Sequence, residues 1–112
     1  MMPKPPKEFC IDSFEYFEYG GTNDWSDPVY EEPIIIKDCR IDRGTEYSST
    51  TSGRQLLYNA VIFCYEGITS PLPEFKTQSM IRFDDKDYTV LKVIPIYEAY
   101  EKVLYSYELE VV

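Results

Sequence analysis

The clearest pattern in the chain is the alternation of apolar and polar residues over residues 80–95, MIRFDDKDYTVLKVIP. Two short β-like runs flank four polar residues at 84–87, and a period of two on both sides of a tight turn predicts a β-hairpin. Pro95 has no backbone N–H to donate, so we expect it to end or bulge the second strand.

Four further runs predict strands. Residues 9–19 interleave aromatic and acidic residues before a predicted turn at 20–24, and residues 28–43 include three consecutive isoleucines, which favour extended backbone. Residues 57–65 carry apolar side chains at both odd and even positions, as expected of a strand that is covered on both faces or that meets another subunit on one face. Residues 103–111 alternate cleanly again.

The remaining segments contain few helix signals. Pro71 and Pro73 predict an irregular connection before the hairpin. A helical spacing of apolar residues near the C-terminus competes with the strand pattern, so we allow a short helical turn at 97–102.

About six strands, with neither a repeat nor a long helix, favour an all-β fold in the form of a small antiparallel β-barrel, because closing the sheet hides its edges. The 112 residues suit one core, and a domain of this size buries roughly 65% of its unfolded surface. The 16% aromatic content agrees with strands. Residues 1–8, rich in proline and lysine, are expected to form a flexible N-terminal arm, and residues 9–112 the barrel.

The Ser/Thr-rich segment from Gly44 to Leu56 contains no aliphatic residue before its end, which predicts a long mobile loop. Long polar loops of small barrels are often used for contact, so this loop is the first candidate site. Its candidate residues are Arg43, Gly44, Thr45, Glu46, Tyr47, Ser48, Ser49, Thr50, Thr51, Ser52, Gly53 and Arg54.

The net charge of −9 argues against nonspecific nucleic-acid binding, which depends on Lys and Arg displacing counterions. An acidic wall could still let DNA slide past without adhesion. The widely spaced Cys10, Cys39 and Cys64 are expected to be buried thiols. We find no basic-apolar leader and no apolar run near the ~20 residues that span a bilayer, so we expect folding in the cytoplasm and no membrane contact.

The chain has no histidine, which excludes imidazole-based hydrolysis and His-ligated zinc. The densest carboxylate set is Asp84, Asp85 and Asp87, which could hold a divalent cation in a metal-dependent hydrolase. Aspartate is also common in hairpin turns, and this simpler interpretation is preferred. We therefore expect no catalytic residue, no metal site and no cofactor.

The region PEFKTQSMIRFDDKDYTVLKVIPIYE and the alternating final strand resemble the minor capsid or head-completion proteins of long-tailed bacteriophages, the stoppers of the head-to-tail connector. The shared element is a Phe, an Ile or Val before an aspartate-rich or glycine turn, and then Tyr-x-Val-x-x-Val-x-Pro. Lys86 and Asp87 stand where a glycine often lies. The residues of this hairpin motif are Phe75, Ile81, Phe83, Asp84, Asp85, Tyr88, Val90, Val93 and Pro95.

The resemblance implies a ring of copies beneath the portal, with an adaptor protein above and a tail-completion or tail-tube protein below. The segment from Gly44 to Leu56 would then enter the channel, make transient contact with packaged DNA and help to retain it. The protein would move from the host cytoplasm to the neck of the virion. Tail completion in the same neck, the carboxylate hydrolase and a generic cellular adaptor barrel remain as alternatives.

Overall fold

The computed structural model describes residues 4–44, 46–50, 53–99 and 102–112. Within them, one 3-10 turn precedes ten strands. The elements are η1 (Lys7–Phe9), β1 (Asp12–Phe17), β2 (Tyr19–Thr22), β3 (Pro28–Tyr30), β4 (Ile34–Asp42), β5 (Glu46–Thr50), β6 (Gly53–Tyr58), β7 (Ala60–Tyr65), β8 (Met80–Phe83), β9 (Lys86–Tyr97) and β10 (Leu104–Val111).

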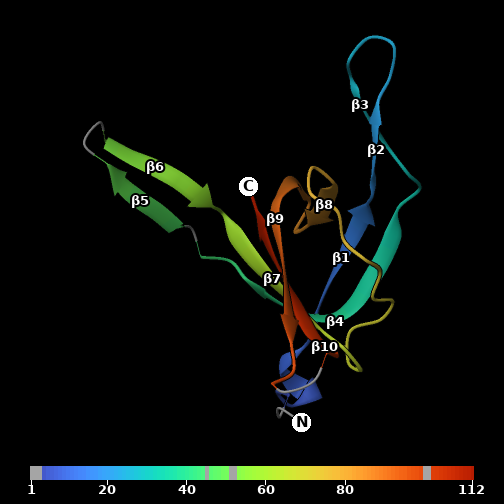
Figure 1. Ribbon diagram of the computed structural model, residues 1–112, viewed down its shortest axis with the longest axis vertical. Coiled ribbons are helices and arrows are strands. Elements are labelled where there is room, and N and C mark those ends of the chain that lie inside the picture. Colours follow the sequence, from blue (N-terminus) through green and yellow to red (C-terminus); the bar gives the residue numbers. More distant parts are fainter. Residues whose placement is uncertain (1–3, 45, 51–52, 100–101) are drawn as a thin grey trace.

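Six of these strands close an antiparallel barrel in the order β1-β4-β7-β10-β9-β8 (Figure 1). The predicted hairpin is its β8–β9 segment, and the predicted final strand is β10. The all-β barrel predicted from the sequence is therefore confirmed. Within the described residues there is no helix long and apolar enough to cross a membrane.

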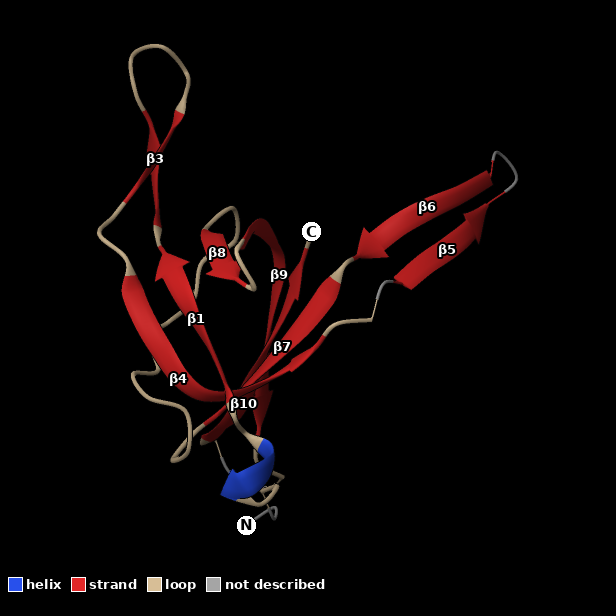
Figure 2. Ribbon diagram, turned by 180° about the vertical axis from the view of Figure 1, so that it is seen from behind, coloured by secondary structure: helices blue, strands red, loops and turns tan. Residues whose placement is uncertain are grey.

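The other four strands form two separate hairpins, β2–β3 and β5–β6. Both extend away from the barrel in the two opposite views of Figures 1 and 2. The radius of gyration is 15.2 Å, whereas about 13 Å is expected for a compact domain of this length. The excess agrees with a small barrel that carries two projections.

The core fills the barrel. The strand predicted at 57–65 divides at Asn59, so its first two residues end β6 and the rest form β7. Strand β7 is buried at every position except Phe63, which confirms for this part the prediction of a strand covered on both faces. It lies between β4 and β10. The buried core residues are Phe14, Tyr16, Ile36, Cys39, Ile41, Ala60, Ile62, Cys64, Phe75, Ile81, Phe83, Val90, Leu109 and Val111.

The connection between β7 and β8 is irregular, as the prolines predicted, and an aromatic residue fastens it to the barrel. The ring of Phe75 meets those of Tyr16 at 5.0 Å and Tyr107 at 5.4 Å, both edge to face. Tyr16 Oη accepts a hydrogen bond from the Lys76 N–H at 2.9 Å and shares another with Ser79 Oγ at 3.2 Å. A segment without regular structure is thereby held in place.

Several local predictions differ from the structure. The turn expected at 20–24 lies at 23–26, because the strand continues through Gly21, which takes a φ of 98° next to a register shift. The hairpin turn contains only Asp84 and Asp85, while residues 86–87 already pair with β8. Both aspartates have positive φ, as a type I′ turn requires, and aspartate tolerates this conformation without glycine.

Pro95 was expected to end or bulge β9, but the strand continues to Tyr97. Its partner across the ladder is Tyr107 of β10. On the other edge β9 pairs with β8 only over residues 86–89, so near Pro95 that edge has no partner strand among the described residues. A missing N–H therefore costs little there. The helical turn predicted at 97–102 begins inside β9 and lies partly outside the described residues.

Candidate functional site

The first candidate site is the segment that follows β4. In place of the predicted irregular loop, its described parts pair as the antiparallel strands β5 and β6, with Tyr47 opposite Leu56 and Ser49 opposite Arg54. Residues 45, 51 and 52 lie outside the described residues. The prediction was wrong about these parts because the Tyr and Thr of β5 favour strands, and pairing with β6 satisfies its backbone groups. Figure 1 shows the hairpin extending from the barrel; we call it the arm.

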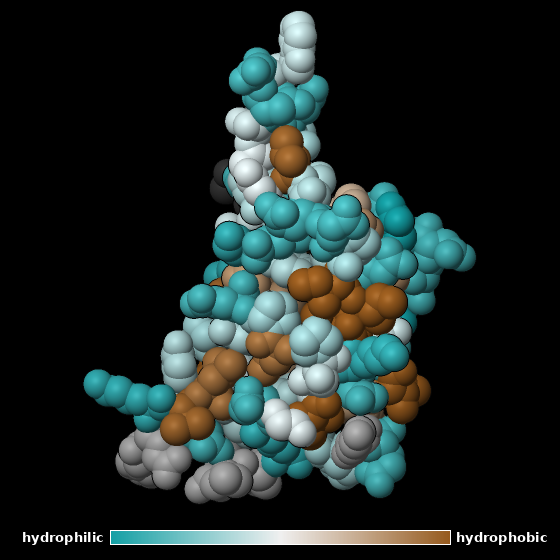
Figure 3. Space-filling view, turned by 90° about the vertical axis from the view of Figure 1, so that its right-hand side faces the viewer, coloured by the Kyte–Doolittle hydropathy of each residue, from teal (hydrophilic) through white to brown (hydrophobic). Residues whose placement is uncertain are grey.

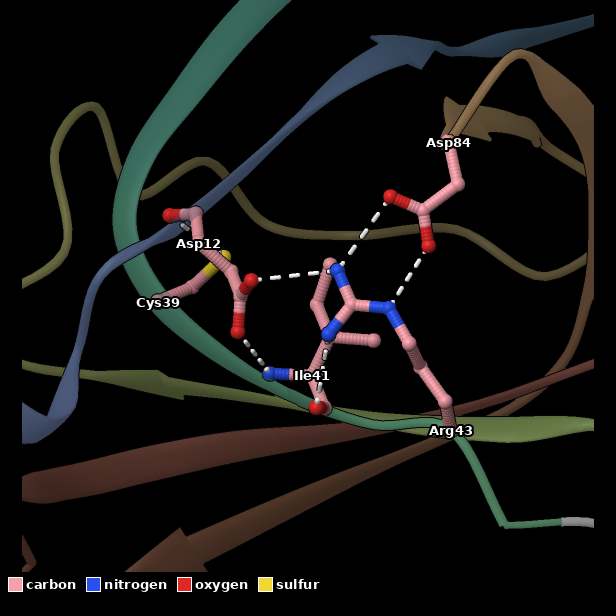
Figure 4. A network of polar contacts seen from close by, with 5 residues as sticks. All are labelled: Asp12, Cys39, Ile41, Arg43 and Asp84. Atoms are coloured by element: carbon pink, nitrogen blue, oxygen red, sulfur yellow. Dashed lines mark hydrogen bonds and ion pairs between the residues drawn. The ribbon is translucent and has the colours of Figure 1, made fainter.

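Arg43 clamps the root of the arm to the barrel (Figure 4). Its Nε donates to Asp84 Oδ2 at 2.6 Å, and its Nη2 donates to Asp12 Oδ1 at 3.1 Å and to Asp84 Oδ1 at 3.4 Å. Nη1 donates to the carbonyl of Ile41 at 3.4 Å. One guanidinium thus joins the strand before the arm to β1 and to the β8–β9 turn.

Asp12 is held in turn from its other side. Its Oδ2 accepts the N–H of Ile41 at 3.0 Å, and its carbonyl accepts a weak hydrogen bond from Cys39 Sγ at 3.3 Å. The register of the β1–β4 pair shifts at this point. A backbone N–H near the irregularity is therefore satisfied by a carboxylate, and the same carboxylate orients Arg43.

The charges of the clamp stabilise each other. The hydrogen bonds that Arg43 donates to Asp84 and, to a lesser extent, to Asp12 raise the pKa of Arg43, and the guanidinium lowers the pKa of Asp84 below its ordinary value of 3.8. The Arg43 side chain is 46% exposed, so solvent screens these pairs. Their main effect is therefore geometric, because a planar guanidinium that binds two carboxylates fixes three chain segments in one arrangement.

An open depression of about 460 Å³ lies beside the clamp. Arg43 lies over the ring of Phe83 at 5.6 Å, and Phe83 stacks on Tyr88 at 4.4 Å. The walls offer cationic, amide and phenol groups with one carboxylate, which suits polar contact with another chain. Its lining residues are Arg43, Asn59, Ala60, Asp84, Lys86 and Tyr88.

The hairpin motif serves mainly as core. Four of its residues, Phe75, Ile81, Phe83 and Val90, are buried in the barrel, and Val93 packs partly against it. Two motif residues reach the other candidate site through Arg43: Asp84 accepts its hydrogen bonds, and the ring of Phe83 lies under its guanidinium. Sequence reasoning named all three of these residues but missed Asp12, which no local pattern connects to a residue 31 positions away.

The aspartates of the β8–β9 turn region do not converge on a common point. Asp84 pairs with Arg43, whereas Asp87 binds Arg82 Nε at 2.7 Å. Hydrogen bonds from these guanidinium groups lower the pKa of both carboxyls. No three acidic or cysteine residues among those described are grouped so that they could hold a metal ion. These observations favour the turn interpretation.

The three cysteines are buried free thiols, as predicted. Burial raises the pKa of Cys39 to about 12 and that of Cys64 well above its ordinary value of 9.0. These two groups therefore stay protonated near neutral pH, and a protonated thiol is a poor nucleophile and metal ligand.

Comparison with known proteins identifies a family that the chain matches over most of its length. Residues 6–111 match the minor capsid protein family. An uncharacterised protein of Lactococcus phage LL-H, ORF5, is 31% identical over 88 residues, which are 76% of this chain and 73% of that protein. ORF5 of Lactococcus phage mv4, also uncharacterised, is 28% identical over 61 residues, 52% of this chain and 54% of that protein. No solved structure matches significantly. The chain therefore belongs to the minor capsid protein family, and this membership supports a structural, non-enzymatic role in the phage particle.

Proposed function

We propose that this minor capsid protein is a subunit of the head-to-tail connector, the stopper that completes the head. Several copies form a ring below the portal and its adaptor, retain the packaged DNA and present a docking surface to a tail-completion or tail-tube protein. The observation that carries the proposal is a closed barrel of a phage capsid family with an arm whose root is clamped by Arg43.

The charge of the arm suits transient contact with DNA. Residues 46–58, which form the arm, hold one arginine and one glutamate, so the arm is neutral in a chain of net charge −9, and Arg43 at its root is already paired with Asp12 and Asp84. Phosphate attraction grows with the number of cations, so an arm without net charge gives only weak contact. The remaining surface is acidic and repels the duplex. A ring of such arms would touch DNA in the channel without binding it tightly.

The barrel surface carries exposed apolar residues that are suited to contacts between subunits. Phe9, Ile11 and Ile35 are 63%, 82% and 55% exposed. Figure 3 shows several apolar patches among polar ones on one face. Exposed apolar groups in a structural protein mark association surfaces, and a head-to-tail contact that closes generates a ring. Association with other virion proteins follows from the family, and the ring and neck position are our proposal.

The proposal is tested by locating the protein in purified particles. Mass spectrometry should find it at roughly a dozen copies or fewer, as a single cyclic ring requires, and immunogold labelling should mark the neck. Label spread over the head shell would contradict a connector role. Label at the tail side of the neck would replace the stopper with a tail-completion protein.

A further inference from the structure

The second projection, the β2–β3 hairpin, carries an exposed tryptophan at its tip. Trp25 is the sole tryptophan of the chain and is 84% exposed. The hairpin stands apart from the barrel in Figures 1 and 2, and in Figure 3 it is a mainly polar upper projection. A large aromatic side chain at such a place adds nothing to the core of its own chain.

Hydrogen bonds within the tip hold its backbone in one conformation. Asn23 Oδ1 accepts the N–H groups of Trp25 at 2.8 Å and of Asp27 at 3.0 Å. The backbone of Asn23 is also paired with those of Ser26 and Asp27. A preorganised tip loses less conformational entropy when it binds, so the backbone that carries Trp25 is already ordered.

The root of the hairpin is tied to the barrel. The Tyr19 N–H donates to Ser79 Oγ at 2.9 Å, and Lys76 Nζ lies 3.6 Å from Glu18 Oε2. The rings of Tyr19 and Tyr30 meet edge to face at 6.3 Å across the two strands. These contacts give the projection a defined base and direction, although two strands alone are only marginally stable.

The β2–β3 hairpin and the arm differ in charge. Residues 8–36 contain eight acidic residues and no lysine or arginine, so they account for −8 of the net charge of −9. Five of these acids lie within residues 18–32. Such a surface is repelled by DNA and attracted to a basic protein surface. The two projections therefore differ in chemistry, and the hairpin is suited to a protein partner.

We propose that the β2–β3 hairpin docks on another protein of the particle, with Trp25 in an apolar pocket rimmed by Lys and Arg. This inference rests on the virion role proposed above. Tryptophan is enriched among the residues that dominate binding energy, and surrounding acids would steer the encounter and set the register. The depression beside the arm of a second copy fits poorly, because its Arg43 is already bound by Asp12 and Asp84.

The test places a photo-cross-linking amino acid at position 25 in full-length protein assembled into particles. Irradiation should join it to one other virion protein, at apolar residues flanked by Lys or Arg. The same group at Val103, which is 49% exposed, controls for surface proximity. A cross-link to DNA or to a second copy, a product shared with the control, or no cross-link in particles that contain the protein would overturn the inference. Absence of the protein from particles would instead refute the virion role on which it rests.

Matched variants test the same contact quantitatively. Trp25→Ala should lower incorporation into particles at limiting protein by about 30-fold, the effect of a typical hot-spot residue, while Trp25→Phe should retain much of it. Asp24→Lys combined with Asp27→Lys should also impair incorporation. Unchanged thermal unfolding of each variant shows that the barrel is intact. Wild-type incorporation of Trp25→Ala would overturn the role of the indole.

Discussion

The hydroxyl of Tyr16 should contribute measurably to stability, because it joins the irregular connection and the hairpin root to the barrel. Tyr16 is 1% exposed. Its Oη accepts the Lys76 N–H and shares a hydrogen bond with Ser79 Oγ, which in turn accepts the Tyr19 N–H. Tyr16→Phe removes this oxygen and keeps the ring that meets Phe75 edge to face at 5.0 Å.

The expected loss of stability in Tyr16→Phe follows from the two hydrogen bonds that the substitution removes. A net value of about 1 kcal/mol for each hydrogen bond gives a loss of about 2 kcal/mol in the free energy of unfolding. With about 2.1 cal/mol/K of unfolding entropy per residue, the chain should lose about 8 °C in Tm. For an m-value of about 2 kcal/mol/M, the urea midpoint should fall by about 1 M.

Circular dichroism is the appropriate signal, because Trp25 is 84% exposed in the folded protein and its fluorescence reports little about the core. Tyr97→Phe, at a residue that is 56% exposed, is the matched control and should stay within about 0.5 kcal/mol of wild type. A double-mutant cycle with Ser79→Ala should give a coupling energy of about 1 kcal/mol. If Tyr16→Phe is no more destabilising than the control, or if the two changes are additive, the reasoning is refuted.

Three further predictions concern the arm, the clamp and the thiols. Excising residues 45–52 should leave the unfolding transition unchanged but reduce the fraction of heads that keep their DNA; full retention would remove the channel role. Because Arg43 lowers the pKa of Asp84, the clamp stabilises the protein above the ordinary pKa of 3.8 and loses this effect as the pH falls through the lowered value. The difference in urea midpoint between wild type and Asp84→Asn should therefore shrink in acid, and a constant difference would contradict the ion pair. Cys39 and Cys64 should resist a thiol reagent at pH 8 until the protein unfolds, and rapid labelling of the native protein would show that they are accessible.

Features marked by a local pattern in the sequence were predicted, whereas features that lack such a pattern or depend on distant contacts were mostly missed. The 80–95 hairpin and the final strand were found because alternation is a local signal of pleated backbone. The arm was missed because the Ser- and Thr-rich strand β5 shows no apolar periodicity and pairs only with β6. The turn residues Asp84 and Asp85 were identified, but the placement of residues 86–87 in the strand depends on the cross-strand register.

The candidate site was predicted in pieces. Arg43 and Asp84 were named for separate reasons, yet their contact joins positions 41 residues apart and depends on closure of the barrel. Asp12 had no signal of its own, since a single acid in an aromatic strand is ordinary. Trp25 was visible in the sequence as a lone tryptophan, but its exposure became evident only when the β2–β3 hairpin was seen to leave the barrel.

The sequence by itself determined the class of fold, the absence of imidazole chemistry, the acidic charge and the resemblance to phage head-completion proteins, because composition, period and motif are properties of the chain alone. The tertiary structure decided which segments leave the barrel and how they are fastened to it. Those outcomes depend on contacts such as Tyr19 with Ser79 and Arg43 with Asp84, whose partners are far apart in the sequence and meet only when six strands close on themselves.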